Sequence, residues 1–232
     1  MINNLSSFLN FTEIILSRFS GKKDQGTSAN FLIEMCFRSY DLLVAIEKLE
    51  ESELKQTDIE HPVGLLLRSG LYDFINFQYI TTSCVEKDKM NRRAFETMVK
   101  EYMSSHFNGI NEKFELKDDL KNLERFSEFG KKKKFKTLGI LKEGKEFAKS
   151  KKINYLQEAI AIWEWYSKYE HYGVFTHLMY QELENNHQRK LIAVHLVMSN
   201  IHLCFCTLND LGTDKFQLSE LSDMEQILLN FY

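Results

Sequence analysis

The chain has 232 residues, a mass of 27.4 kDa and a formal net charge of −3 at pH 7. It contains one proline and ten glycines, whereas average usage of about 5% proline would give roughly twelve prolines. Because the tight turns of β-sandwiches, barrels and α/β proteins draw on glycine and proline, this composition predicts an all-α fold. The small net charge excludes a chain that is a polycation over its whole length.

Apolar residues recur with helical spacing along most of the chain. The stretches predicted to be helical are 5–19, 32–49, 63–85, 91–107, 118–129, 154–172, 188–208 and 219–231. Together they predict a helical bundle of seven to nine helices in a single domain, 1–232. Pro62 is expected at the first position of its helix, and Asn154 and Ser219 are expected to cap theirs. The stretch 63–85 is apolar on nearly every face, so we expect it to be the most buried helix.

Three features bear on localisation. Residues 1–18 hold no basic residue before their apolar stretch and no small-residue cleavage site, so we expect no signal peptide. Residues 191–209 lack Asp, Glu, Lys and Arg, but they contain several polar side chains, and a helix buried in a protein core explains them better than a membrane span. The four cysteines include no C-x-x-C pair and lie in apolar contexts, typical of reduced thiols. These features predict a cytoplasmic protein with no membrane partner.

A strong local charge lies in residues 131–152, which hold ten lysines and two glutamates and begin with Lys131, Lys132, Lys133 and Lys134. Their net charge of +8 leaves −11 for the rest of the chain. One interpretation is a solvated face whose lysine stems cover apolar surface. The other is an electrostatic footprint for phosphate or an RNA backbone. Lysine without arginine gives charge but little recognition, which favours the solvated face.

Five of the seven histidines lie between His171 and His202, which makes a metal site the first hypothesis to test. Glu184 and His187 have the Glu-x-x-His spacing of a di-iron bundle, but that chemistry needs a second copy and two further carboxylates. The chain has no second copy. His195 and His202 share a helix face with apolar neighbours, so core histidines explain them better than metal ligands. We therefore expect no metal, and the lack of a glycine-rich phosphate loop predicts no cofactor.

Two segments resemble the signatures of a known family. The first is Leu65-Leu66-Leu67-Arg68-Ser69-Gly70-Leu71-Tyr72-Asp73, and the second is Trp165-Tyr166-Ser167-Lys168-Tyr169-Glu170-His171-Tyr172-Gly173. They resemble the arginine-bearing central helix and the Tyr-Ser-x-x-x-His-x-Gly signature of a bacterial family of HEPN-like helical proteins of unknown function. Order and separation agree, and the resemblance covers roughly residues 30–210. That family carries a glutamate four residues after the arginine, where this chain has Tyr72 followed by Asp73.

The resemblance implies a HEPN-like protein of RNA metabolism or cellular defence, with a metal-independent ribonuclease-type activity. Such cleavage needs an acid or base with a near-neutral pKa and a cation that stabilises the phosphorane, which histidine and arginine supply. The candidate catalytic residues are Arg68 and His171 on facing helices, together with Tyr166 or Ser167 in one polar pocket. RNA would be the substrate.

A second candidate pair lies along one helix. Arg189 and His195 have five residues between them, which matches the Arg-x4-6-His spacing of HEPN ribonucleases. The same spacing arises by chance in a chain with this many arginines and histidines, so the match carries little weight by itself.

The alternative is a non-catalytic helical module that binds a partner protein or a small ligand. Arg68 would then be a buried arginine satisfied by Asp73, by Tyr166 or by backbone carbonyls, and His171 would pair with a neighbouring tyrosine. Both hypotheses allow a homodimer, because HEPN-like sites often form at two-fold helix interfaces.

Overall fold

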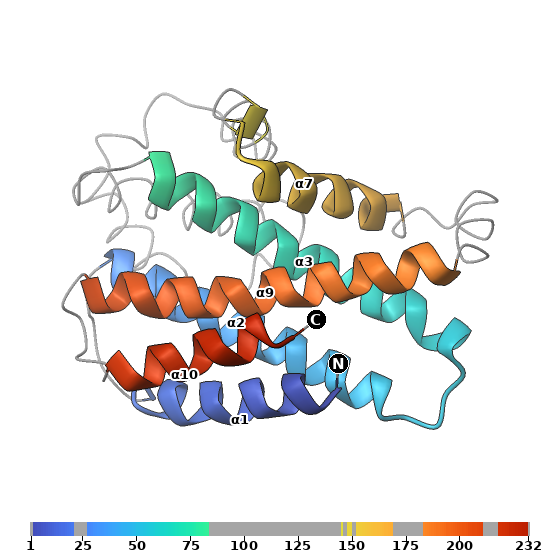
Figure 1. Cartoon of the computed structure of the whole chain (residues 1–232), viewed down its shortest axis with the longest axis horizontal. Helices are drawn as coiled ribbons and strands as arrows, with labels where there is room; N and C mark the ends of the chain where they lie inside the picture. The colour runs from blue at the N-terminus through green and yellow to red at the C-terminus, as the bar shows by residue number, and fades with distance from the viewer. Residues whose placement is uncertain are drawn as a thin grey trace, which may run out of the picture.

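The computed structural model describes residues 2–20, 27–83, 145, 148–149, 152–168, 183–210 and 218–231. Within these ranges it contains six helices and no strand, which confirms the all-α prediction for this part of the chain. The helices are α1 (Ile2–Ser17), α2 (Thr27–Glu50), α3 (Gln56–Ser83), α7 (Asn154–Ser167), α9 (Leu183–Asp210) and α10 (Leu218–Leu229) (Figure 1). The predicted stretches 91–107 and 118–129 lie outside the described residues.

Helix α9 lies at the centre and packs against α2, α3, α7 and α10 (Figure 1). It runs antiparallel to α2, because Lys190 contacts Glu50 near one end of the pair while Asn200 donates a hydrogen bond to Ser39 further along. The segment Asn186–Asp210 is long and apolar enough to cross a membrane by length and composition, and 56% of its most apolar window is buried inside the protein. Lys190, Asn200 and His202 of this helix meet partners on other helices, as expected of a core element.

Helices α3 and α7 also run antiparallel. Arg68 of α3 contacts Ser167 at the end of α7, whereas Gln78 contacts Tyr155 at its start. Residues 73–78 of α3 are all buried, which requires neighbours on every side of a helix because six residues cover more than one full turn. Those neighbours are α2, α7 and α9, so residues 73–78 have the burial that the sequence predicts for this helix, and the burial of residues 79–85 lies outside what the structure describes.

The start of α3 differs from the sequence-based prediction. The helix begins at Gln56, and Pro62 lies inside it instead of at its first position. A proline inside a helix removes one backbone hydrogen bond and crowds the carbonyl four residues earlier. Burial of Ile59 and Val63, one on each side of the proline, explains why the helix nevertheless continues through it.

The entry into α7 also differs. Asn154 is the first helical residue and Ile153 occupies the cap position without any side-chain hydrogen bond. The preceding turn has the two backbone hydrogen bonds of a Schellman motif, from Ile153 to Ala148 and from Lys152 to Lys149, with Lys152 at a φ of 55°. The chain therefore enters α7 directly from the end of another helical turn, which leaves no room for an asparagine cap. Similarly, α10 begins one residue before Ser219.

Helices α1 and α10 cover the outer side of α2 and α9 (Figure 1). They are antiparallel to each other, because Arg18 forms an ion pair with Glu220 at one end and the Asn4 amide donates to the Asn230 carbonyl, at 2.7 Å, at the other. Helices α1 and α10 therefore pack against each other along one side of the bundle.

Candidate functional site

Arg68 is held by α7 through two contacts. Its Nε donates a hydrogen bond to the Ser167 hydroxyl at 3.1 Å, and its guanidinium carbon lies 5.3 Å from the centre of the Trp163 ring. Ser167 in turn donates to the Trp163 carbonyl at 2.8 Å. Trp163 and Ser167 are four residues apart on α7 and so share one face, which fixes the position of the guanidinium. Of the residues expected in one polar pocket with Arg68, Ser167 is in contact with it.

Two further candidate partners of Arg68, Tyr166 and Asp73, are buried. Tyr166 is only 1% exposed and belongs to the apolar core. Asp73 forms an ion pair with Arg38 of α2, with 3.0 Å between Oδ2 and Nε. Five residues separate Asp73 from Arg68, which turns its side chain by about 140° around α3. The carboxylate therefore faces α2, while the guanidinium of Arg68 faces α7.

Several predicted site residues lie outside the described part of the chain. His171 follows the end of α7 by four residues and is one of them. Lys131, Lys132, Lys133 and Lys134 are also outside it. The convergence of Arg68 with His171 and the placement of the lysine run therefore stay predictions.

The described part of the lysine-rich stretch has the character of a solvated face. Lys145 forms an ion pair with Glu164 of α7, and both side chains are more than one-third exposed. Lys149 and Lys152 are exposed as well. Exposed pairs of this kind contribute little to stability. These three lysines thus agree with the first of the two interpretations of residues 131–152.

Arg189 and His195, the second candidate pair, contact different neighbours. The Arg189 guanidinium lies 3.8 Å from the centre of the Trp165 ring and donates to Asn186 at 3.2 Å. The His195 ring packs against Phe231, with 5.9 Å between ring centres. Six residues along a helix correspond to about 9 Å of rise and 120° of rotation. Arg189 therefore contributes to the packing of α9 against α7, whereas His195 contributes to the packing of α9 against the segment that holds Phe231.

Two histidines of α9 lie against α10. His202 Nε2 is 3.2 Å from the Leu221 carbonyl, and His195 has a hydrogen bond with the Leu228 backbone. Burial lowers the pKa of both histidines below the ordinary value of 6.5, and the backbone hydrogen bonds oppose this shift without cancelling it. Both rings are therefore neutral near pH 7.

We expect these two histidines to make the protein less stable in mild acid. A lowered pKa means that the unfolded chain binds protons first as the pH falls, so the free energy of unfolding should decrease between about pH 7 and about pH 5. The double variant His195→Gln/His202→Gln should show a flatter pH dependence in urea unfolding, and His187→Gln, on an exposed position of α9, is the matched control. An unchanged slope in the double variant would contradict this assignment.

A cysteine and a histidine meet one turn apart on α9. Cys206 Sγ lies 3.6 Å from His202 Nε2, a contact that the apolar sequence context did not suggest. Burial raises the pKa of the Cys206 thiol, and the nearby Asp210 and Glu225 raise it further. Burial also raises the pKa of Cys204 well above its ordinary value. A nucleophilic cysteine needs the opposite shift, so neither thiol is suited to covalent catalysis.

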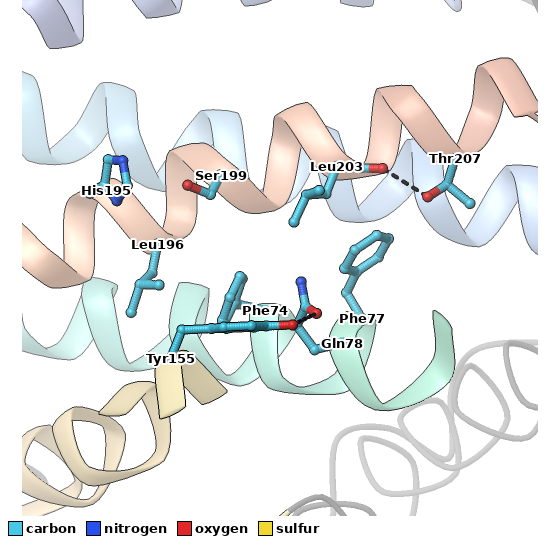
Figure 2. Close-up of a pocket in the computed structure, with 9 residues that line it drawn as sticks. All are labelled: Phe74, Phe77, Gln78, Tyr155, His195, Leu196, Ser199, Leu203 and Thr207. Carbon is cyan, nitrogen blue, oxygen red and sulfur yellow. Dashed lines mark hydrogen bonds between the residues drawn. The ribbon is translucent and has the colours of Figure 1, made fainter. Parts of the chain in front are cut away.

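A groove of about 550 Å³ opens between α3, α7 and α9 (Figure 2). Leu196 and Leu203 of α9 point across it toward α3, and Tyr155 of α7 lies along its edge. Its lining residues are Phe74, Phe77, Gln78, Tyr155, His195, Leu196, Ser199, Leu203 and Thr207. Sequence patterns alone missed this groove, because its residues come from three separate helices and no local pattern links them.

Within the described residues, no group of three or more His, Cys, Asp or Glu side chains is placed to hold a metal ion. No known protein family, no curated protein and no solved structure matches this chain significantly.

Proposed function

We propose that this chain is a HEPN-like helical protein of RNA metabolism or cellular defence that cleaves RNA without a metal ion. The observation that supports the proposal most is the hydrogen bond between Arg68 and Ser167, which joins two segments 99 residues apart in the sequence. These are the two segments that carry the family resemblance. The proposal includes the HEPN-like bundle of seven to nine helices that the resemblance implies.

In the proposed reaction the RNA 2′-hydroxyl attacks the adjacent phosphorus, and the bond from phosphorus to the 5′ oxygen breaks. The Arg68 guanidinium stabilises the charge on the phosphorane, for which its planar fork is suited. His171 takes the proton from the 2′-hydroxyl and delivers it to the departing 5′ oxygen, which leaves a 2′,3′-cyclic phosphate. Ser167 and Trp163 are positioning residues, since they hold the guanidinium on one side of α7. The proposal treats residues 131–152 as a solvated face, with RNA binding by Lys131–Lys134 as the alternative.

The proposal is tested by comparing the growth of cells that express the wild-type chain or the His171→Ala variant. We expect the wild-type chain to slow growth and to reduce intact cellular RNA, and the variant to do neither at equal expression. His187→Ala is the matched control, because His187 is exposed on α9 and outside the proposed site. Equal toxicity of wild type and His171→Ala, or no toxicity of either, would contradict the proposal.

A second candidate function is a non-catalytic module that binds a small ligand or a partner protein. The groove between α3, α7 and α9 favours the ligand, because its walls are mostly apolar with a few polar groups. The two functions differ in one measurable respect, since a binding module leaves RNA intact. A homodimer is compatible with both.

A further inference from the structure

The side chains that line the groove between α3, α7 and α9 are suited to an aromatic ligand. Phe74, Phe77, Leu196 and Leu203 line it with apolar surface. Tyr155 is 46% exposed at its edge and meets Phe74 edge-to-face, with 6.4 Å between ring centres and 66° between ring planes. An aromatic ring that is held by a neighbouring ring and still open to solvent provides a ready surface for stacking.

One polar group in this lining is available to a ligand. The hydroxyl of Ser199 makes no hydrogen bond with any described residue. The hydroxyl groups of Thr207 and Tyr155 are engaged, the first with the Leu203 carbonyl at 2.8 Å and the second with Gln78 Oε1 at 3.1 Å. The lining contains no Asp, Glu, Lys or Arg. Burial keeps His195 neutral near pH 7. The groove therefore has no charged group that could pair with a charged ligand, and such a ligand would lose hydration without gaining an ion pair.

We propose that the groove binds a small, uncharged, flat aromatic molecule that stacks on Tyr155 and hydrogen-bonds to Ser199. Its volume of about 550 Å³ lies within the range of small-molecule sites. Phe74, the groove residue of α3 that is nearest to Arg68 in the sequence, follows it by six residues, which corresponds to about 9 Å along the axis and 120° of rotation. The site is therefore separate from the proposed cleavage site, and the proposal holds whether or not the chain cleaves RNA.

The test uses N-phenyl-1-naphthylamine, an uncharged pair of aromatic units with one N–H group, whose fluorescence rises in apolar surroundings. We expect a saturable rise with one site per wild-type chain. Ser199→Trp fills the groove and should abolish this rise, whereas Ser199→Ala removes one hydrogen bond and should weaken binding about fivefold. Ile14→Trp places the same large side chain on an exposed position of α1 and should leave binding unchanged.

Tyr155→Ala provides a second variant if Ser199→Trp fails to fold. Because Tyr155 is half exposed, its removal should leave the helical circular dichroism signal intact, and the loss of stacking should weaken binding about fivefold to tenfold. A fluorescence rise that does not saturate in the wild-type chain overturns the proposal. A saturable rise that persists unchanged in Ser199→Trp, or in Tyr155→Ala where the former does not fold, also overturns it.

Discussion

Replacing Lys190 with methionine is expected to destabilise the protein by about 3–5 kcal/mol, because the Glu50 carboxylate would remain buried without its partner. The two side chains are 2% and 9% exposed, with 2.8 Å between Nζ and Oε1. Glu50 is the last residue of α2, and Lys190 lies in the N-terminal part of α9. Methionine has nearly the length of lysine, so this substitution removes the charge while largely filling the same space. Urea unfolding at neutral pH measures the effect.

The double variant Lys190→Met/Glu50→Leu is the control for this prediction. It removes both charges and fills their place with apolar side chains, which is often neutral for a buried ion pair. We therefore expect the double variant to recover most of the stability that Lys190→Met loses. A loss below about 1 kcal/mol in Lys190→Met would contradict a buried, paired role for Lys190.

The second large effect is expected at Gly70 of α3, where Val197 of α9 packs directly against the glycine. A Cβ atom at this position would lie 2.6 Å from Cγ2 of Val197. Val197 is β-branched and has little rotamer freedom in a helix, so it cannot turn away. Gly70→Leu should therefore separate the two helices and cost about 3 kcal/mol, even though leucine favours a helix over glycine. Thermal and urea unfolding both measure this loss.

A double-mutant cycle tests whether the close approach is the cause. Gly70→Ala adds one methyl group against Val197, and Val197→Ala removes two methyl groups from the same place. The double variant should be more stable than the sum of the two single effects predicts, by about 1 kcal/mol. Additive effects would show that the two positions do not compete for space.

Much of the fold could be predicted because local patterns determine it. The near absence of proline predicts helices throughout, the expected stretches 32–49 and 188–208 lie within α2 and α9, and α7 covers 154–167 of the expected stretch 154–172. The errors lie at helix ends. Pro62 predicts a boundary by its backbone chemistry, but the burial of its neighbours on both sides favours a continuous helix. Burial arises from the whole bundle, and no local pattern contains that information.

Within the candidate site, the contact between Arg68 and the helix that carries Ser167 could be predicted from the sequence. An arginine among leucines requires acceptors, and the hydroxyl of Ser167 provides one for Arg68. The pairing of Asp73 with Arg38 could not be predicted, because it depends on which helix packs against the far side of α3. The signal for Trp163 was present, since a residue four positions before Ser167 shares its helix face.

The most direct test of the proposed function is cleavage of single-stranded RNA by the purified chain in the presence of EDTA. We expect the wild-type chain to cleave RNA but not DNA of the same sequence, because DNA lacks the attacking 2′-hydroxyl. His171→Ala and Arg68→Ala should each lower the rate at least about a hundredfold, while His187→Ala leaves it unchanged. RNA that stays intact with the folded wild-type chain, or cleavage that both site variants retain, would contradict the proposed function.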